Sequence, residues 1–179
     1  LAVCLCLAPA TLYALHDDAT AISGAVSISC DSDHNTCNIT ASDNAIIEHN
    51  SFNIGANDTV NFIQPSVDAT VLNRVVGNLP TQINGYLNAN GNIVLVNTNG
   101  ITFGSSAHVN VGGLIASTRD ITNENFLSGQ YLFGSVDQTI KETYAQLVNQ
   151  GSIVARNGGY AVLIGAAVAN EGKIVAPLG

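Results

Sequence analysis

Short apolar runs, separated every few residues by Asn, Gly or Ser, fill residues 88–118. The four runs are rich in β-branched side chains and too short for helices; they cover residues 93–96, 101–103, 109–111 and 114–116. Asn-Gly pairs at 90/91 and 99/100 supply residues that tolerate positive φ at tight corners. The pattern predicts short strands that coil around a core, which is an all-β, parallel β-helix architecture.

A repeat in the last part of the chain supports this prediction. The sequence of residues 149–155, NQGSIVA, recurs at residues 170–176 as NEGKIVA, an offset of 170 − 149 = 21 residues with five of seven positions identical. A period near twenty residues is about one rung of a solenoid. Terminal rungs need a polar cap for solubility, and residues 177–179 provide none. We therefore expect the native protein to continue beyond residue 179.

Composition limits both the core and the partners. Aromatic residues make up 6% of the chain, without Trp or Met, so the core must be built from Val, Ile, Leu and Ala. Only 10% of residues are charged, the formal net charge is −8, and the five basic residues are scattered singly. Phosphate binding needs clustered Lys and Arg, so we expect no nucleic-acid partner. The surface must instead be polar and uncharged, as in secreted β-solenoids.

Residues 1–14 form an apolar run that ends in small residues and resembles the tail of a secretory signal peptide. Cleavage is expected after Ala10 or Ala14, which leaves residues 15–179 as one domain. The run is too short to span a bilayer as a helix. Two alternatives are a buried first strand and a lipoprotein box that ends at Cys4.

Residues 20–40 predict two strands joined by a polar loop, an N-terminal β cap with Cys30 and Cys37 at the two necks of the loop. In an exported chain such a pair forms a disulfide, worth roughly 2.5 kcal/mol for so small a loop. The alternative is a metal site made by Asp31, Asp33 and His34 with the two thiolates. Its spacing matches no zinc pattern, so we expect no metal and no cofactor.

Two further segments carry polar groups. Glu48 and His49 are adjacent, so on a strand they point to opposite faces and cannot form an acid/base pair; we interpret them as a solvated turn. Residues 121–151 hold most of the charge and aromatic side chains of the second half of the chain. We predict that this segment leaves the solenoid as a short hairpin. It serves either as a contact surface or as a cover for an apolar patch.

Several segments, in this order, resemble the N-terminal secretion domain of two-partner-secretion exoproteins, the filamentous-haemagglutinin-like adhesins. The resemblance extends from about residue 20 to the end of the chain. Its segments are residues 61–65 (NFIQP), 72–75 (LNRV), 83–87 (INGYL), 97–104 (NTNGITFG), 109–118 (VNVGGLIAST) and the repeat with 158–160 (GGY). The resemblance implies a right-handed parallel β-helix with a targeting role.

The secretion motif of the family is Asn-Pro-Asn-Gly, and this chain has Asn97, Thr98, Asn99 and Gly100 at that place. In a type I turn proline pre-sets φ at the second position, so we expect the turn to form with Thr but to be less rigid. The second family motif, Asn-Pro-Asn-Leu, has no counterpart. Together with the Cys30/Cys37 pair, this suggests similarity to adhesin and haem-acquisition exoproteins rather than to filamentous haemagglutinin itself.

The resemblance also implies a partner and a route. Such domains cross the periplasm and are recognised there, unfolded or partly so, by the POTRA domains of an Omp85-type outer-membrane transporter. They then fold at the bacterial cell surface or are secreted, and a host-cell surface or carbohydrate ligand would belong to the full-length adhesin. The central Asn residues could contact the transporter or hold turns, and we favour the second role.

Two other functions were weighed. A β-helix polysaccharide lyase or hydrolase needs carboxylates or basic groups that converge on one groove. The only dense group of acids after residue 70 lies in the excursion, at positions 120, 124, 137 and 142, and does not repeat at rung spacing. We therefore expect no catalytic residues. Binding of a host receptor or haem protein by this part of the chain could invoke His34 or His108. A lone His on a strand is usually a solvated side chain.

Overall fold

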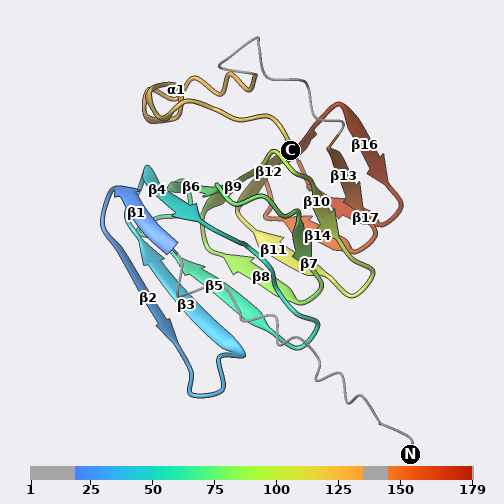
Figure 1. Cartoon of the computed structure of the whole chain (residues 1–179), viewed down its shortest axis with the longest axis horizontal. Coiled ribbons are helices and arrows are strands. Elements are labelled where there is room, and N and C mark those ends of the chain that lie inside the picture. Colours follow the sequence, from blue (N-terminus) through green and yellow to red (C-terminus); the bar gives the residue numbers. More distant parts are fainter. Residues whose placement is uncertain (1–18, 135–144, 179) are drawn as a thin grey trace, which may run out of the picture.

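The computed structural model describes residues 19–134 and 145–178, which wind into a parallel β-solenoid (Figure 1). The predicted signal peptide and both expected cleavage points lie outside the described residues. Within the described residues no helix is long and apolar enough to cross a membrane. The stacking of the described strands into parallel sheets confirms the expected all-β, parallel fold.

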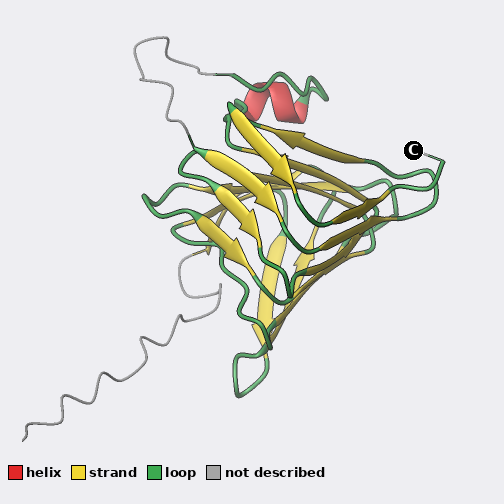
Figure 2. Ribbon diagram, turned by 90° about the vertical axis from the view of Figure 1, so that its right-hand side faces the viewer, coloured by secondary structure: helices red, strands yellow, loops and turns green. Residues whose placement is uncertain are grey.

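Three sheets run along the solenoid and form its walls (Figure 2). Sheet A contains β1 (Ala19–Ser23), β4 (Ala45–His49), β6 (Thr70–Val75), β9 (Asn92–Asn97), β12 (Gly113–Ser117) and β15 (Ala161–Ile164). Sheet B contains β2 (Val26–Cys30), β3 (Thr36–Ala41), β5 (Thr59–Ile63), β8 (Tyr86–Ala89), β11 (His108–Val111), β14 (Ser152–Ala155) and β17 (Lys173–Val175). Sheet C contains β7 (Thr81–Ile83), β10 (Ile101–Phe103), β13 (Gln146–Asn149) and β16 (Ala167–Asn170).

From β5 onward each full turn of the chain adds one strand to each sheet, in the order B, A, C, while the turn that begins with β3 contributes only an isolated bridge at Ile54 to sheet C. From β3 onward the neighbouring strands within a sheet are parallel, and the repeat found in the sequence lies in register: Asn149 is opposite Asn170, and Ile153 is opposite Ile174. The offset of 21 residues is therefore one rung, as predicted.

The N-terminal strands close the first rung in a different way. β2 pairs antiparallel with β3, and β1 pairs antiparallel with β4. They lie at the ends of sheets B and A and cover strand edges that would otherwise be open. This arrangement is the predicted β cap, with Ile28 of β2 opposite Ile39 of β3.

The lumen of the solenoid is a continuous core that is mainly aliphatic, as expected, but also contains the buried rings of Phe52, Phe62 and Phe103. Alternate side chains of each strand point inward, and the parallel register stacks them in columns. One column in sheet B runs through Val60, Leu87, Val109 and Ile153, all at most 1% exposed. Burying each such side chain contributes about 1.5–3 kcal/mol, so the stacked columns are the main source of stability.

Glycine is required where two corners touch. The Gly112 N–H donates to the Gly91 carbonyl oxygen at 2.7 Å. A Cβ at Gly112 would lie 2.6 Å from the same oxygen, closer than carbon and oxygen can approach. The Gly112 corner can stack on the Gly91 corner only because Gly112 has no side chain, while a Cβ at Gly91 would lie 2.5 Å from the Ala69 carbonyl oxygen of the preceding corner.

The predicted excursion leaves the solenoid after β12. Figure 2 shows its helix α1 (Asn123–Leu127), in red, outside the strands. The described part of the excursion is thus a helical turn within a loop and contributes no hairpin strand, while residues 135–144 lie outside the described residues. The loop covers the outer face of sheet A. That face carries a second apolar cluster, distinct from the lumen, made by Ile46, Leu72, Val94, Val96 and Ile115 together with Ile121 and Phe126 of the excursion.

Candidate functional site

The motif segment 97–100 forms the turn between β9 and β10, where sheet A meets sheet C. The Gly100 N–H donates to the Asn97 carbonyl oxygen at 3.2 Å, which closes the turn. Gly100 has φ of 126°, a conformation that favours glycine. Thr98 occupies the second position, and the turn forms without the proline of the family motif.

The side chain of Asn97 is fully buried and joins two rungs. Its Nδ2 donates to the Leu79 carbonyl oxygen and to Thr81 Oγ1, each at 3.0 Å. Its Oδ1 accepts from the Asn99 backbone N–H at 2.9 Å. The amide therefore bonds to its own turn and to the turn of the preceding rung, which uses its hydrogen-bonding capacity inside the fold.

The other two motif side chains, of Thr98 and Asn99, are exposed. Asn99 Nδ2 donates to the Gly77 carbonyl oxygen at 2.8 Å, again on the preceding rung. Next to this turn lie Val76 and Leu79, which are 57% and 64% exposed. The motif therefore contributes one buried link between rungs and a small exposed surface with apolar neighbours.

Another segment that carries the family resemblance also forms a corner. Gln64 is 5% exposed, and its Nε2 donates to the carbonyl oxygens of Ala69 and Asn92 at 2.8 and 3.1 Å. Its Oε1 accepts from the Gly91 N–H at 3.1 Å. The Gln side chain fills the corner between β5 and β6 and binds it to the next rung, which explains why this polar residue lies in an apolar segment.

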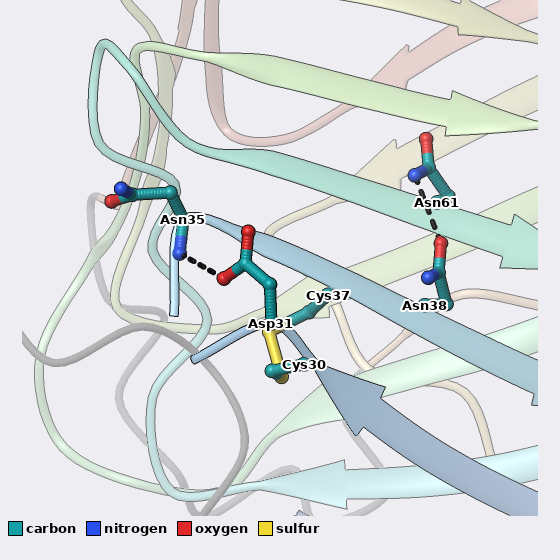
Figure 3. Close-up of a disulfide and its surroundings, with 6 residues drawn as sticks. All are labelled: Cys30, Asp31, Asn35, Cys37, Asn38 and Asn61. Carbon is teal, nitrogen blue, oxygen red and sulfur yellow. Dashed lines mark hydrogen bonds between the residues drawn. A yellow bond between two sulfur atoms is a disulfide. The ribbon is translucent and has the colours of Figure 1, made fainter. Parts of the chain in front are cut away.

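Cys30 and Cys37 are opposite each other in the β2–β3 hairpin and are joined by a disulfide (Figure 3). Asp31, a ligand in the alternative metal site, instead accepts the Asn35 N–H at 2.9 Å and thereby shapes the loop. In the part of the chain that the structure describes, no group of three or more His, Cys, Asp or Glu residues could hold a metal ion.

His49 corrects the interpretation of residues 48 and 49 as a solvated turn. It is 1% exposed and faces the lumen from β4, because residues 45–49 form a strand and place Glu48 on the outer side. His49 Nε2 lies 3.0 Å from Asn73 Oδ1; that oxygen can only accept, so Nε2 carries the proton. Burial lowers the pKa of His49 to about 4, an effect larger than the opposing one of the Asn73 hydrogen bond.

Sequence reasoning missed the role of Arg74. This residue points outward from β6 and is 9% exposed. Its Nε donates to Asp120 Oδ1 at 2.9 Å, and its Nη1 donates to Asn123 Oδ1 at 2.7 Å and to Glu48 Oε1 at 3.3 Å. Its Nη2 donates to the Ile121 carbonyl oxygen. A single Arg within an apolar strand was the available signal, but its three partners in the excursion lie 46 to 49 residues further along the chain and Glu48 lies 26 residues before it.

Two of the four acids considered for catalysis, Asp120 and Glu124, lie in the part of the chain that the structure describes. Asp120 binds Arg74, and Glu124 is exposed in the first turn of α1. The acids at positions 137 and 142 lie outside the described residues.

The exposed His108 stacks on Tyr86, with ring centroids 5.1 Å apart on the outer face of sheet B.

Known proteins are similar to this chain in sequence and in fold. A family model described as the TPS secretion domain matches residues 16–177. Two heme/hemopexin-binding proteins of Haemophilus influenzae are 39% identical over 133 residues and 42% identical over 92 residues, which is 72% and 51% of this chain. The chain spans only 14% and 10% of those two relatives.

The crystal structure of the HMW1 secretion domain from Haemophilus influenzae is similar, with a TM-score of 0.81 and 38% sequence identity. The match covers 88% of this chain and 41% of the HMW1 chain. These similarities confirm the resemblance inferred from the sequence.

Proposed function

The chain belongs to the TPS secretion domain family, and from that premise we propose that it targets a large adhesin-like or haemagglutinin-like exoprotein for secretion. Domains of this family belong to secreted exoproteins and depend on a dedicated two-partner transporter. The observation that carries the proposal is the family match over residues 16–177, combined with the close structural match to the HMW1 secretion domain.

In this proposal the chain reaches the periplasm and is recognised there by the POTRA domains of an Omp85-type transporter. The described strands have three to six residues and are rich in apolar side chains, so while unfolded they can add to the edge of a partner sheet. With 10% charged residues, the chain carries few groups that resist passage through a pore. Stacking of the rungs at the cell surface then favours movement of the rest of the chain outward through the transporter, because the folded part cannot return through the pore.

We propose that the motif turn serves secretion by holding the fold together. The support is the burial of Asn97 and its bonds to the preceding rung, to Leu79 and Thr81. The exposed side chains of Thr98 and Asn99 are the part of the motif that a transporter could contact. The two roles can be separated by comparing Asn97 with Thr98, because Asn99 also bonds to the Gly77 carbonyl oxygen of the preceding rung.

The test is a secretion assay in which the chain, preceded by a restored signal peptide, is produced with or without a cognate two-partner transporter. We expect transporter-dependent appearance in the medium, lost in Asn97→Ala and retained in Asn110→Ala. Asn110 is the matched control, because its side chain is exposed on β11, the strand that follows β10 in the chain. Thr98→Ala should be secreted normally if the motif acts through folding. Retention of the unmodified chain in the periplasm with every cognate transporter would refute the targeting role.

Neither alternative function is favoured. The described acids are used in ion pairs or lie on the surface, and the matched family is one of secretion domains. For the full-length exoprotein, the names of two relatives favour a haem-carrying host protein as ligand over a carbohydrate. We propose that this activity lies outside the present chain, so the purified chain should not bind haem-loaded hemopexin in a calorimetric titration.

A further inference from the structure

Residues 120–134, which we call the clasp, form a closed loop with its own hydrogen bonds. The Gly134 N–H donates to the Asp120 carbonyl oxygen at 3.0 Å and joins the two ends of the loop. Within it, Thr122 Oγ1 accepts from the Asn125 N–H at 3.1 Å and caps α1. The loop is thus a compact unit that docks on the solenoid as one piece.

The inner side of the clasp is apolar and completely covered. Phe126 and Ile121 are at most 1% exposed and pack against the outer face of sheet A. The side chains beneath them come from four successive strands of that sheet, namely Ile46 of β4, Leu72 of β6, Val94 and Val96 of β9, and Ile115 of β12. This docking surface exists only when all four strands are stacked.

Arg74 adds a polar lock at the edge of the same surface. It binds Asp120, Asn123 and the Ile121 carbonyl oxygen on the clasp, and at the same time Glu48 on the neighbouring strand β4. A guanidinium that is 9% exposed needs all these acceptors, because an unpaired buried charge is unfavourable. Arg74 is therefore fully paired only when β4, β6 and the clasp are together.

We propose that the clasp is a folding latch: it closes after β4, β6, β9 and β12 of sheet A have stacked, and it then holds this part of the solenoid against unfolding. The fully buried residues of its docking surface all precede it in the sequence, between residues 46 and 115, and only the partly buried Tyr160 and Ile164 at the β15 side follow it. A contact made late in folding slows unfolding and leaves the folding rate almost unchanged. This inference does not depend on the transporter and goes beyond the targeting role.

The test measures the folding and unfolding rates of the purified chain by stopped-flow mixing in urea. Phe126→Ala removes the apolar anchor, so we expect the unfolding rate to rise about 100-fold and the refolding rate to change by less than about twofold. Leu127→Ala is the matched control, because this neighbouring side chain is 47% exposed on the outer side of α1. It should change neither rate by more than about twofold.

A second pair of variants tests the polar lock. Arg74→Met keeps an apolar side chain but removes the bonds to the clasp, so unfolding should accelerate about tenfold. Arg156→Met removes an exposed ion pair with Asp68, and its rates should stay within about twofold of the unmodified chain. If Phe126→Ala does not fold, Phe126→Leu should still accelerate unfolding about tenfold.

Two outcomes would overturn the proposal. If Phe126→Ala slows refolding as much as it accelerates unfolding, the clasp forms together with the strands and is no latch. If neither rate changes, the clasp is a passive cover. Failure of secretion in the transporter assay leaves these rate measurements unaffected, so the two proposals fail separately.

Discussion

Sheets A and B are built from the same rungs but meet different surroundings. In β6 and β9 of sheet A every residue is buried, because the lumen lies on one side and the clasp on the other. In β11 of sheet B buried and exposed residues alternate, because its outer face meets water. The strand sequences show the same contrast, with a continuous apolar run, IVLV, at residues 93–96 and alternation, HVNV, in β11.

This contrast shows how a repeating fold acquires one special side. A strand that is apolar on both faces must be covered on both, and the solenoid itself covers only the inner one. The clasp supplies the missing cover, whereas the outer face of sheet B needs none because it carries asparagine. The inserted segment is thus matched to the one wall that requires it.

The largest effect should follow from a charge placed under the clasp. Val94→Asp buries a carboxylate that has no partner on the outer face of sheet A, so we expect a loss of about 4 kcal/mol or more in the free energy of unfolding. Urea unfolding followed by circular dichroism measures it. Asn110→Asp on the outer face of sheet B should cost less than about 0.5 kcal/mol. Equal losses would mean that the two outer faces do not differ.

The second prediction concerns pH and compares two histidines. The pKa of His49 is about 4 in the folded chain, against 6.5 for an ordinary histidine, so below pH 6.5 the unfolded chain binds a proton that the folded chain does not. Stability should therefore fall as pH drops through this window, by about 2 kcal/mol at pH 5 and about 3 kcal/mol at pH 4.

Unfolding titrations at several pH values test this prediction. His49→Gln should remove the fall between pH 6.5 and 5, whereas His108→Gln, exposed on sheet B, should retain it. An unchanged slope in His49→Gln would assign the pH dependence to other groups.

The third prediction concerns the covalent link at the end of sheet B. Replacing both Cys30 and Cys37 by Ser should lower the free energy of unfolding by about 2.5 kcal/mol, since the cross-link limits the unfolded chain. Calorimetric melting measures the change. The unmodified protein in a reducing agent should show the same loss, and the double variant should not respond to the reducing agent. A response of the double variant would indicate a different effect of the reagent.

The smallest effect is expected in the side-chain ladder on the outer face of sheet B. Asn88 Nδ2 donates to Asn61 Oδ1, and Asn61 Nδ2 donates to Asn38 Oδ1, each at 3.0 Å. Asn61→Ala breaks both bonds in a partly solvated setting and should cost about 1 kcal/mol. Asn110→Ala should cost less than about 0.5 kcal/mol by the same urea assay. If the two losses are the same, the ladder does not stabilise the sheet.

The sequence predicted features that depend on local pattern. Short runs and Asn-Gly corners indicated a solenoid, and the repeat at residues 149 and 170 set the rung length that the register shows. The excursion was visible as a change in composition. Its helix was not, because α1 has five residues and its order depends on Phe126 packing against sheet A.

Features that depend on distant partners could not be read from the sequence. The pattern around His49 predicts a solvated turn, because the sequence alone does not show that residues 45–49 form a strand whose His49 side faces the lumen. The bonds of Arg74 to residues 120–123 depend on how far β6 lies from the excursion in space. The roles of residues 97–100 in secretion remain predictions, while their place in the fold is now described.

The ladder of Asn38, Asn61 and Asn88 also favours one register between the neighbouring strands that carry it. If β8 slipped by one residue against β5, Leu87 would turn to water and Asn88 would turn to the lumen, because strand side chains alternate. A strand in the wrong register would lose its apolar contact in the lumen and its side-chain amide hydrogen bond. It would also bury an amide that has no hydrogen-bond partner. The rungs of β3, β5 and β8 thus resist a slip of register through their amides, whereas the same column holds Val154 in β14 and Val175 in β17 and gives no such protection there.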